Sequence, residues 1–269
     1  MYITHPQQSV NGLPPEDVFY AADAAGQPVG EGLLIRTYQP YLFPERPLNL
    51  YLSIRAGSGG AGADMLLGAL LARAQQIREA NPQMKARVFT QVDPQDQAQL
   101  ALYMENGFDS TDAMDVVQVG MPAARPNAPM GYDMGAVPFR TPAERQAFLN
   151  RMNLYRMDAW QPAMLERYMS FPHFFALYLS RGPEVVGEIA FTGDGSSAKL
   201  LGMYISPNYR RLGLAKTLVA AGLKILGDKG VTHVEGDVIR RSPAQCALAS
   251  ACNCSYLRTA CCYPGINYD

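Results

Sequence analysis

Hydrophobic and polar residues alternate along the first half of the chain in a way that predicts paired strands and then a helix. Alternation in Asp17–Asp23 predicts a strand, and AGQP turns the chain into a partner strand over Val29–Leu42. A third strand is expected at Pro47–Ala56. The glycines of RAGSGGAG predict a turn. Beyond that turn, apolar residues recur at helical spacing and predict a helix, namely at Ala63, Leu67, Leu70, Ala74 and Ile77.

Three shorter elements complete this half. Ala86–Val92 predicts a strand, and Asp93–Phe108 predicts a short helix that is capped by Asp93 and ended by Gly107. Met114–Met121 predicts the last strand of the series.

A similar order of elements follows the segment 122–131, which is rich in Pro and Ala and predicts a linker. Thr141, Pro142 and Glu144 form the pattern of a capping box and predict the start of a helix. The later elements expected are a helix at Gln161–Phe171, a hairpin of Phe174–Ser180 and Glu184–Gly193, a strand at Ala198–Ser206, a long helix, a strand at Thr232–Val238, a short helix and a last extended piece.

This repeated order predicts two α/β domains, at residues 1–122 and 131–269, with 123–130 as the linker. In the second domain, helical spacing predicts that the long helix buries Leu214, Leu218, Gly222 and Ile225.

Composition narrows the class of protein. Of 269 residues, 48% are hydrophobic and 17% are charged, which suits packed cores and excludes extensive disorder. The net charge of −1 and the lack of a long Lys/Arg run make nucleic acid an unexpected partner. No apolar run is long enough to cross a bilayer, and the first residues resemble no signal peptide. We therefore expect a cytoplasmic protein that does not act at a membrane.

The cysteines are confined to the end of the chain, at Cys246, Cys252, Cys254, Cys261 and Cys262. Their odd number argues against a disulfide framework. Zinc is an alternative, but CNC and CC match no common ligand spacing, so we expect reduced thiols and no metal.

Positive charge gathers where the long helix of the second half begins. Arg210, Arg211 and Lys216 surround a turn opened by Gly213 and Ala215. The unpaired amides and the dipole of a helix start attract anions, whereas cations there oppose the dipole and do not stabilise the helix. The pattern therefore favours a binding turn for a diphosphate.

The setting of this turn resembles the GNAT superfamily of N-acetyltransferases. The family signature [RQ]-x-x-G-x-[GA] is matched by Arg210, Gly213 and Ala215, directly after a strand and before a long helix. The resemblance implies two domains of α/β (α+β) class, each with a mixed, mostly antiparallel sheet flanked by helices. It also implies that acetyl-CoA is bound by Met203, Tyr204, Ile205, Arg210, Arg211, Leu212, Gly213, Leu214, Ala215 and Lys216.

The first half resembles the same family in an altered form. ALYMENGF is similar to a helix of the family whose tyrosine, here Tyr103, is the usual general acid. Gly57 or Ser58 stands where the family has an arginine or glutamine in its phosphate turn. In the second half, Leu248 stands where that tyrosine would align. The family's tyrosine is thus matched in the first half and its phosphate turn in the second, which suggests a paired architecture with one cofactor site, in the C-terminal half.

If the resemblance holds, the reaction is direct acetyl transfer to the amine of a small molecule or a peptide. Glu188 and Glu235 are the candidate bases, because they lie on strands beside the predicted cofactor. Tyr256 is the nearest replacement for the missing acid, and NLYRMDAW is a candidate lining of the acceptor pocket. Two alternatives stay open, an inactive acyl-CoA sensor or protein-interaction module, and a structural zinc site in the cysteine-rich tail.

Overall fold

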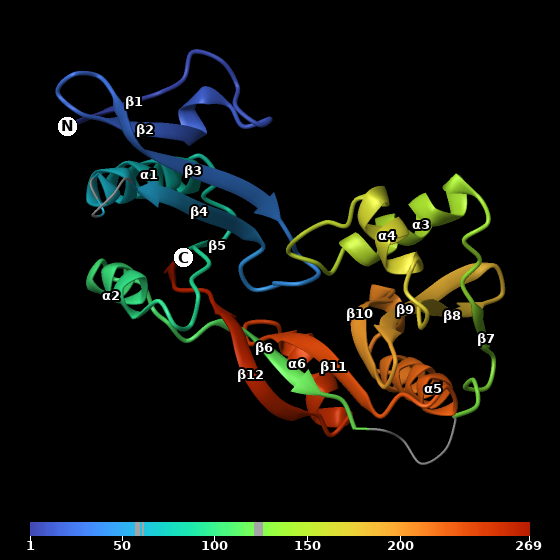
Figure 1. Cartoon of the computed structure of the whole chain (residues 1–269). Helices are drawn as coiled ribbons and strands as arrows, with labels where there is room; N and C mark the ends of the chain where they lie inside the picture. Colours follow the sequence, from blue (N-terminus) through green and yellow to red (C-terminus); the bar gives the residue numbers. More distant parts are fainter. Residues whose placement is uncertain (57–59, 61, 121–125) are drawn as a thin grey trace. The chain divides into compact units, whose positions relative to one another are not determined.

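The computed structural model describes residues 1–56, 60, 62–120 and 126–269. These form two compact units, one of Met1–Ala113 with Cys261–Asp269 and one of Met114–Ala260. Figure 1 labels their elements. Two mixed sheets flanked by helices confirm the expected α/β class.

The first unit is built on a six-stranded sheet in the order β1-β2-β3-β4-β5-β13. Only the pair β4 and β5 is parallel among its recorded pairings. α1 packs on β2, β3 and β4, and its buried residues are those that helical spacing predicted, with Leu66 added and Ala63 excepted. The elements are β1 (Tyr2–Thr4), η1 (Pro15–Asp17), β2 (Val18–Ala22), β3 (Pro28–Tyr38), β4 (Leu48–Ala56), α1 (Ala63–Glu79), β5 (Ala86–Phe89), α2 (Gln97–Glu105) and β13 (Gly265–Tyr268).

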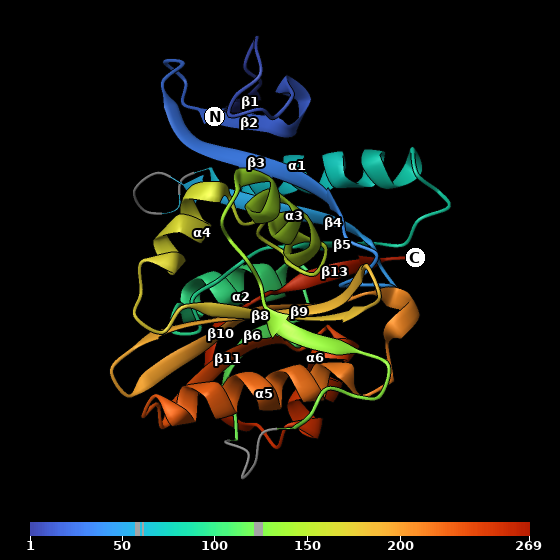
Figure 2. The ribbon, with the colours of Figure 1, turned by 90° about the vertical axis from the view of Figure 1, so that its right-hand side faces the viewer.

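The second unit is built on a seven-stranded sheet in the order β12-β6-β11-β10-β9-β8-β7. Figure 2 shows α5 on one face of this sheet and α3 and α4 on the other. The elements are β6 (Ala113–Gln118), β7 (Asp133–Ala136), α3 (Pro142–Asn153), α4 (Pro162–Met169), β8 (Phe175–Arg181), β9 (Glu184–Asp194), β10 (Ser197–Ile205), η3 (Pro207–Tyr209), α5 (Leu214–Asp228), β11 (His233–Ile239), α6 (Pro243–Ala251) and β12 (Ser255–Cys262).

Two strands belong to a different sheet from the one that chain order suggests. β6 was expected to complete the first half, but it pairs with β11 in the second unit. β13 ends the chain and pairs with β5 in the first unit. The compact units therefore do not coincide with the expected domains 1–122 and 131–269, because hydrophobic alternation identifies a strand without naming its partner. Of the expected linker, residues 123–125 lie outside the described residues, and 126–130 form neither helix nor strand.

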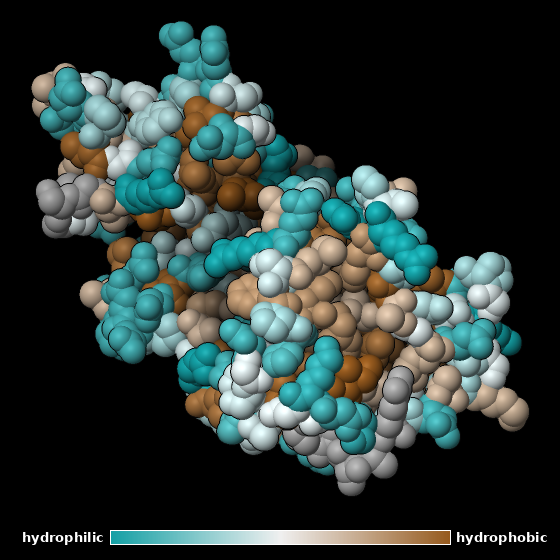
Figure 3. Space-filling model, turned by 45° about the vertical axis from the view of Figure 1, so that its right-hand side comes forward, coloured by the Kyte–Doolittle hydropathy of each residue, from teal (hydrophilic) through white to brown (hydrophobic). Residues whose placement is uncertain are grey.

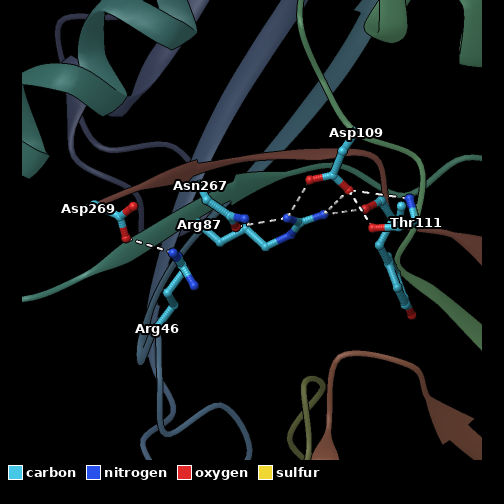
Figure 4. Close-up of polar contacts among 7 residues, drawn as sticks. Arg46, Arg87, Asp109, Thr111, Asn267 and Asp269 are labelled. Carbon is cyan, nitrogen blue, oxygen red and sulfur yellow. Dashed lines mark hydrogen bonds and ion pairs between the residues drawn. The ribbon is translucent and has the colours of Figure 1, made fainter.

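A buried arginine ties β13 to the rest of the first unit (Figure 4). The guanidinium of Arg87, on β5, donates to the Asn267 side chain at 2.9 Å and to the carbonyl of Tyr263 at 3.2 Å. It also makes a two-point contact with Asp109, at 3.0 and 3.1 Å. Arg87 is 2% exposed, so the side chain that contacts β13 is buried and positively charged.

Local capping signals were partly correct. The capping box of Thr141 and Glu144 is present at the start of α3. The prediction that Asp93 caps α2 is wrong. Asp96 caps the helix, since its side chain accepts a hydrogen bond from the Gln99 amide, while Asp93 accepts one from the Gln95 amide in the preceding turn. Both carboxylates precede the same apolar run, and only the chain path decides which one caps the helix.

None of the helices in the described residues is long and apolar enough to span a membrane. The face of the molecule in Figure 3 mixes hydrophilic with hydrophobic residues. All five cysteines are free thiols.

Candidate cofactor site

The central strands of the second sheet part from one another along their length. β10 and β11 pair in parallel from Ser197 and His233 as far as Leu200 and Gly236. Beyond these residues β10 continues to Ile205 and β11 to Ile239 without further pairing between them. A bulge at Leu201 lies where the separation begins. The result is an open stretch between two adjacent strands, which we call the splay.

Backbone groups of β10 face this splay. The amide of Ser206 donates to the Val186 carbonyl of β9 at 2.8 Å. Because the backbone alternates direction along an antiparallel pair, Tyr204 also points its backbone groups toward β9. Met203 and Ile205, which alternate with Tyr204 and Ser206 along the strand, therefore direct their N–H and C=O groups toward the splay. This is the strand that the resemblance assigned to the cofactor arm.

The turn after β10 exposes helix amides. Gly213 is the N-cap of α5 in the left-handed conformation, with φ of 77°, and no side chain caps the helix there. The first turn closes only at Thr217, whose amide donates to the Gly213 carbonyl at 3.1 Å. The amides from Leu214 to Lys216 thus precede the first intrahelical bond. Arg211 also has a positive φ, 62°, which is unusual for a residue other than glycine.

The charges of the turn are not neutralised by the protein. No ion pair within the described residues involves Arg210, Arg211 or Lys216, and the first turn of α5 has no acidic residue. Arg210 instead lies over the ring of Tyr155, 4.9 Å from its centroid. Arg211, Leu212, Gly213 and Lys216 are exposed, whereas Leu214 is buried and anchors the helix. The turn has the charge and the amides that a diphosphate requires.

Two residues at the splay were not identified from the sequence. The hydroxyl of Tyr155 donates to the Ile205 carbonyl at 2.7 Å, and Nη1 of Arg156 donates to the Leu201 carbonyl at 2.8 Å. Both follow α3 in the segment NLYRMDAW, which was singled out only as an acceptor lining. A contact between residues about 50 positions apart leaves no local signal in the sequence.

The candidate base Glu188 is enclosed. It is 1% exposed, and both of its oxygens accept from Arg151, at 2.7 and 2.8 Å. Burial raises the pKa of Glu188 above its ordinary value, while the Arg151 contact acts in the opposite direction. Glu188 lies opposite Tyr204 on β9, which flanks β10 on the side away from the splay, and the contact with Arg151 ties it to α3.

The candidate base Glu235 lies in a more open position. It lines a hollow of about 470 Å³ together with Lys199, Thr192 and Phe171, and it directly precedes Gly236, where the splay begins. Arg258 donates to both oxygens of Glu235 at 3.1 Å and lowers the pKa of that carboxyl. Glu235 is therefore ionised at neutral pH and accessible to water.

The candidate acid Tyr256 does not lie at the splay. Tyr256 is 60% exposed on β12, with β6 and β11 between it and β10, and its hydroxyl lies 3.1 Å from that of Thr259. Tyr103 belongs to the first unit and is 1% exposed there. Burial raises the pKa of Tyr103 above its ordinary value.

The first unit repeats part of this geometry. β4 and β5 pair as far as Tyr51 and Phe89, after which β4 continues to Ala56. There Thr90 donates its hydroxyl to the Leu52 carbonyl at 2.9 Å, so this parted strand also accepts a side-chain hydrogen bond, as β10 does in the second unit. Gly57 and Ser58, at the corresponding turn, lie outside the described residues.

Metal ligation finds no support in the described part of the chain, where no three His, Cys, Asp or Glu side chains are grouped to hold an ion. Burial raises the pKa of the Cys254 thiol to about 11, which keeps it protonated.

Comparison with known proteins finds a family model and solved structures that are similar to this chain. Residues 145–252 match the family described as Acetyltransferase (GNAT) family. No curated protein matches the sequence. A GCN5-related N-acetyltransferase from Sphaerobacter thermophilus is 12% identical, with a TM-score of 0.51 over 96% of this chain and 82% of that chain.

Two further solved structures are similar. A GCN5-related N-acetyltransferase from Anabaena variabilis ATCC 29413 is 12% identical, with a TM-score of 0.52 over 93% of this chain and 62% of that chain. A tandem GNAT protein from the clavulanic acid biosynthesis pathway is 14% identical, with a TM-score of 0.47 over 93% of this chain and 82% of that chain. At 12% identity the two structures with TM-scores above 0.5 show the fold alone, and the residues that match the family model lie within the second unit.

Proposed function

We propose that this protein is an N-acetyltransferase that uses acetyl-CoA, bound in the second unit, and transfers the acetyl group directly to an amine. One observation carries the proposal: the open backbone edge at Met203 and Ile205 leads within a few residues into an uncapped helix start surrounded by cations. An anionic head group with an amide-bearing arm matches both features at once.

The residues present fit such a cofactor. The diphosphate is held by the amides of Leu214 to Lys216 and by the charges of Arg210 and Arg211. The backbone N–H and C=O groups of Met203 and Ile205, on the edge of β10 that faces the splay, would hold the arm by hydrogen bonds. From Ile205 to the bulge at Leu201 the strand extends about 13 Å. The bound cofactor would supply the acetyl group that is transferred.

For proton transfer we propose Glu235, acting through water in the adjoining hollow. Its carboxylate is ionised and accessible, whereas Glu188 is enclosed by Arg151. We propose no role at the acyl group for Tyr256, which β6 and β11 separate from β10, or for Tyr103, which is enclosed in the core of the first unit. A thiol with a pKa near 8.5 can leave as a thiolate without a protein acid.

A second candidate function is an acyl-CoA sensor that binds without turnover. It is favoured by the lack of a tyrosine at Leu248, whose side chain instead packs against the core of the second unit. The acceptor is a small-molecule or peptide amine in the first proposal and absent in the second.

Thermal unfolding with and without acetyl-CoA tests the binding site. A ligand that binds only the folded protein raises the melting temperature, and at 100 times its Kd the stabilisation is about 2.7 kcal/mol. The double variant Arg210→Ala with Gly213→Glu should lose the shift, while Arg55→Ala in the first unit should keep it. A shift that survives the double variant would disprove the site.

Turnover separates the two functions. Free CoA thiol is measured with peptides, lysine, polyamines and amine antibiotics as acceptors. Release that depends on one acceptor supports the transferase, and binding without release from any of them supports the sensor.

A further inference from the structure

The segment that follows α3 supplies hydrogen-bond donors to β10 where β10 has parted from β11. Where β10 leaves β11, its carbonyls would in a continuous sheet accept from β11 amides. The Tyr155 hydroxyl reaches one of them, Ile205, and Arg156 reaches another, Leu201. The two contacts lie on either side of Met203.

The segment that carries these donors is fixed in place. Asn153 joins the two ends of the segment 153–160, since its side chain donates to the Trp160 carbonyl at 3.1 Å and accepts from the Trp160 amide at 2.8 Å. Arg156 lies over the Trp160 ring, 4.5 Å from its centroid, and its Nε donates to the Asp158 carbonyl. Trp160 itself is 2% exposed. The donors are therefore held before any ligand arrives.

The strand leaves room for the arginine. A Cβ at Gly202 would lie 3.3 Å from Nη1 of Arg156, tighter than an ordinary contact. Glycine at this position lets the guanidinium lie close to the backbone of β10 at the bulge.

Tyr155 also contacts the anion-binding turn. Its ring lies beneath the Arg210 guanidinium at 4.9 Å and beside Tyr204 at 5.8 Å. One side chain thus touches the end of the open strand through its hydroxyl and the first arginine of the turn through its ring.

We infer that Tyr155 and Arg156 replace β11 as hydrogen-bond partners of β10 and keep the splay open for the arm, and that Tyr155 sets the position of Arg210. This inference rests on the proposed function. Tyr155 is a positioning residue: its hydroxyl fixes the Ile205 peptide plane, and a carbonyl has two lone pairs, so Ile205 can accept from Tyr155 and from the arm together.

The hydroxyl and the ring can be tested separately. Tyr155→Phe removes the hydrogen bond to Ile205 and keeps the ring under Arg210. Binding is measured by calorimetry for acetyl-CoA and for 3′-phosphoadenosine 5′-diphosphate, which has the head group and lacks the arm. We expect Tyr155→Phe to weaken acetyl-CoA binding about fivefold, because the Ile205 peptide is no longer held in the orientation that hydrogen-bonds the arm, and to leave binding of the armless ligand unchanged.

Tyr168→Phe is the matched control. Its ring packs against Trp160 on the same face of the sheet, and its hydroxyl makes no hydrogen bond within the described residues. It should bind both ligands as the natural protein does. Unchanged acetyl-CoA binding in Tyr155→Phe, or an equal loss for both ligands, would overturn the inference. If the natural protein binds neither ligand, the proposed function itself fails, which is a different result.

Discussion

Gly222 of α5 lies against Phe191 of β9 so closely that a Cβ on Gly222 would come within 2.2 Å of the ring. Phe191 is fully buried and stacks on Phe175, with 5.3 Å between centroids, so it has little room to move. The close packing of α5 on β9 at this point thus depends on the absence of a side chain at Gly222.

Gly222→Ala should therefore destabilise the protein by about 1–3 kcal/mol, the usual cost of overpacking a core. Gly68→Ala in α1 is the matched control, because a Cβ there meets nothing within 4 Å. It should stabilise by about 0.5–1 kcal/mol through helix propensity. Urea unfolding measures both, and equal effects would contradict the packing argument.

Replacement of Arg87 should loosen the C-terminal strand. Arg87→Leu leaves Asp109, Asn267 and the Tyr263 carbonyl without their shared donor. In urea unfolding we expect a decrease of about 2–3 kcal/mol in the free energy of unfolding, below the full cost of a broken buried pair because Asp109 is 38% exposed.

Arg55→Leu is the control for this variant. The Arg55 side chain is 81% exposed and lies 4.0 Å from the carboxylate of Glu31, so its removal should change the stability by less than about 0.5 kcal/mol. If Arg87→Leu destabilises the protein no more than this control does, Arg87 does not anchor β13.

Acid should remove part of the Asp109 contribution. Burial raises the pKa of Asp109, but hydrogen bonds and charge from Arg87 outweigh it and hold the pKa below the ordinary 3.8. A lowered carboxyl pKa stabilises the fold above the unfolded value and ceases to do so as pH falls through the folded value. Asp109→Asn should therefore be less stable than the natural protein at pH 7, and the difference should shrink below pH 3.8. A difference that is constant from pH 7 to pH 3 would contradict the assignment.

Arg211→Gly should separate stability from binding. The positive φ of Arg211 strains a residue with a Cβ, and glycine relieves that strain at an entropic cost of similar size. The melting temperature should therefore stay the same or rise, while the Kd for acetyl-CoA rises at least about fivefold because one positive charge is removed. Asn11→Gly, at a φ of 52° in the first unit, should leave the Kd unchanged. A lower melting temperature in Arg211→Gly would show that this arginine stabilises the turn itself.

Glu235→Gln should lower the rate of acetyl transfer by about 100-fold without changing the Kd for acetyl-CoA. Arg258 keeps the pKa of Glu235 low, so this carboxylate stays ionised at every pH from 6 to 9 and should produce no step in the pH profile there. Glu166→Gln on α4, 64% exposed, is the control and should retain full activity. An unaffected rate in Glu235→Gln would exclude this base.

The sequence predicted the elements well where the signal is local. Helical spacing found the buried face of α5, with Leu214, Leu218 and Gly222 all buried and Ile225 packed at its margin. The basic turn could also be found, because Arg210, Gly213 and Lys216 lie close together along the chain. The short edge strands β1 and β7 were missed, since three or four residues carry too little alternation.

What the sequence by itself determined is therefore the set of longer strands and helices, most of their ends and the charged turn, because each depends on interactions between residues close along the chain. The tertiary structure alone decided that β6 and β13 join sheets away from their neighbours in sequence, that β10 parts from β11 after Leu200, and that Tyr155 reaches Ile205. Strand pairing and side-chain packing join residues tens to hundreds of positions apart, and their energies depend on geometry that no local pattern encodes.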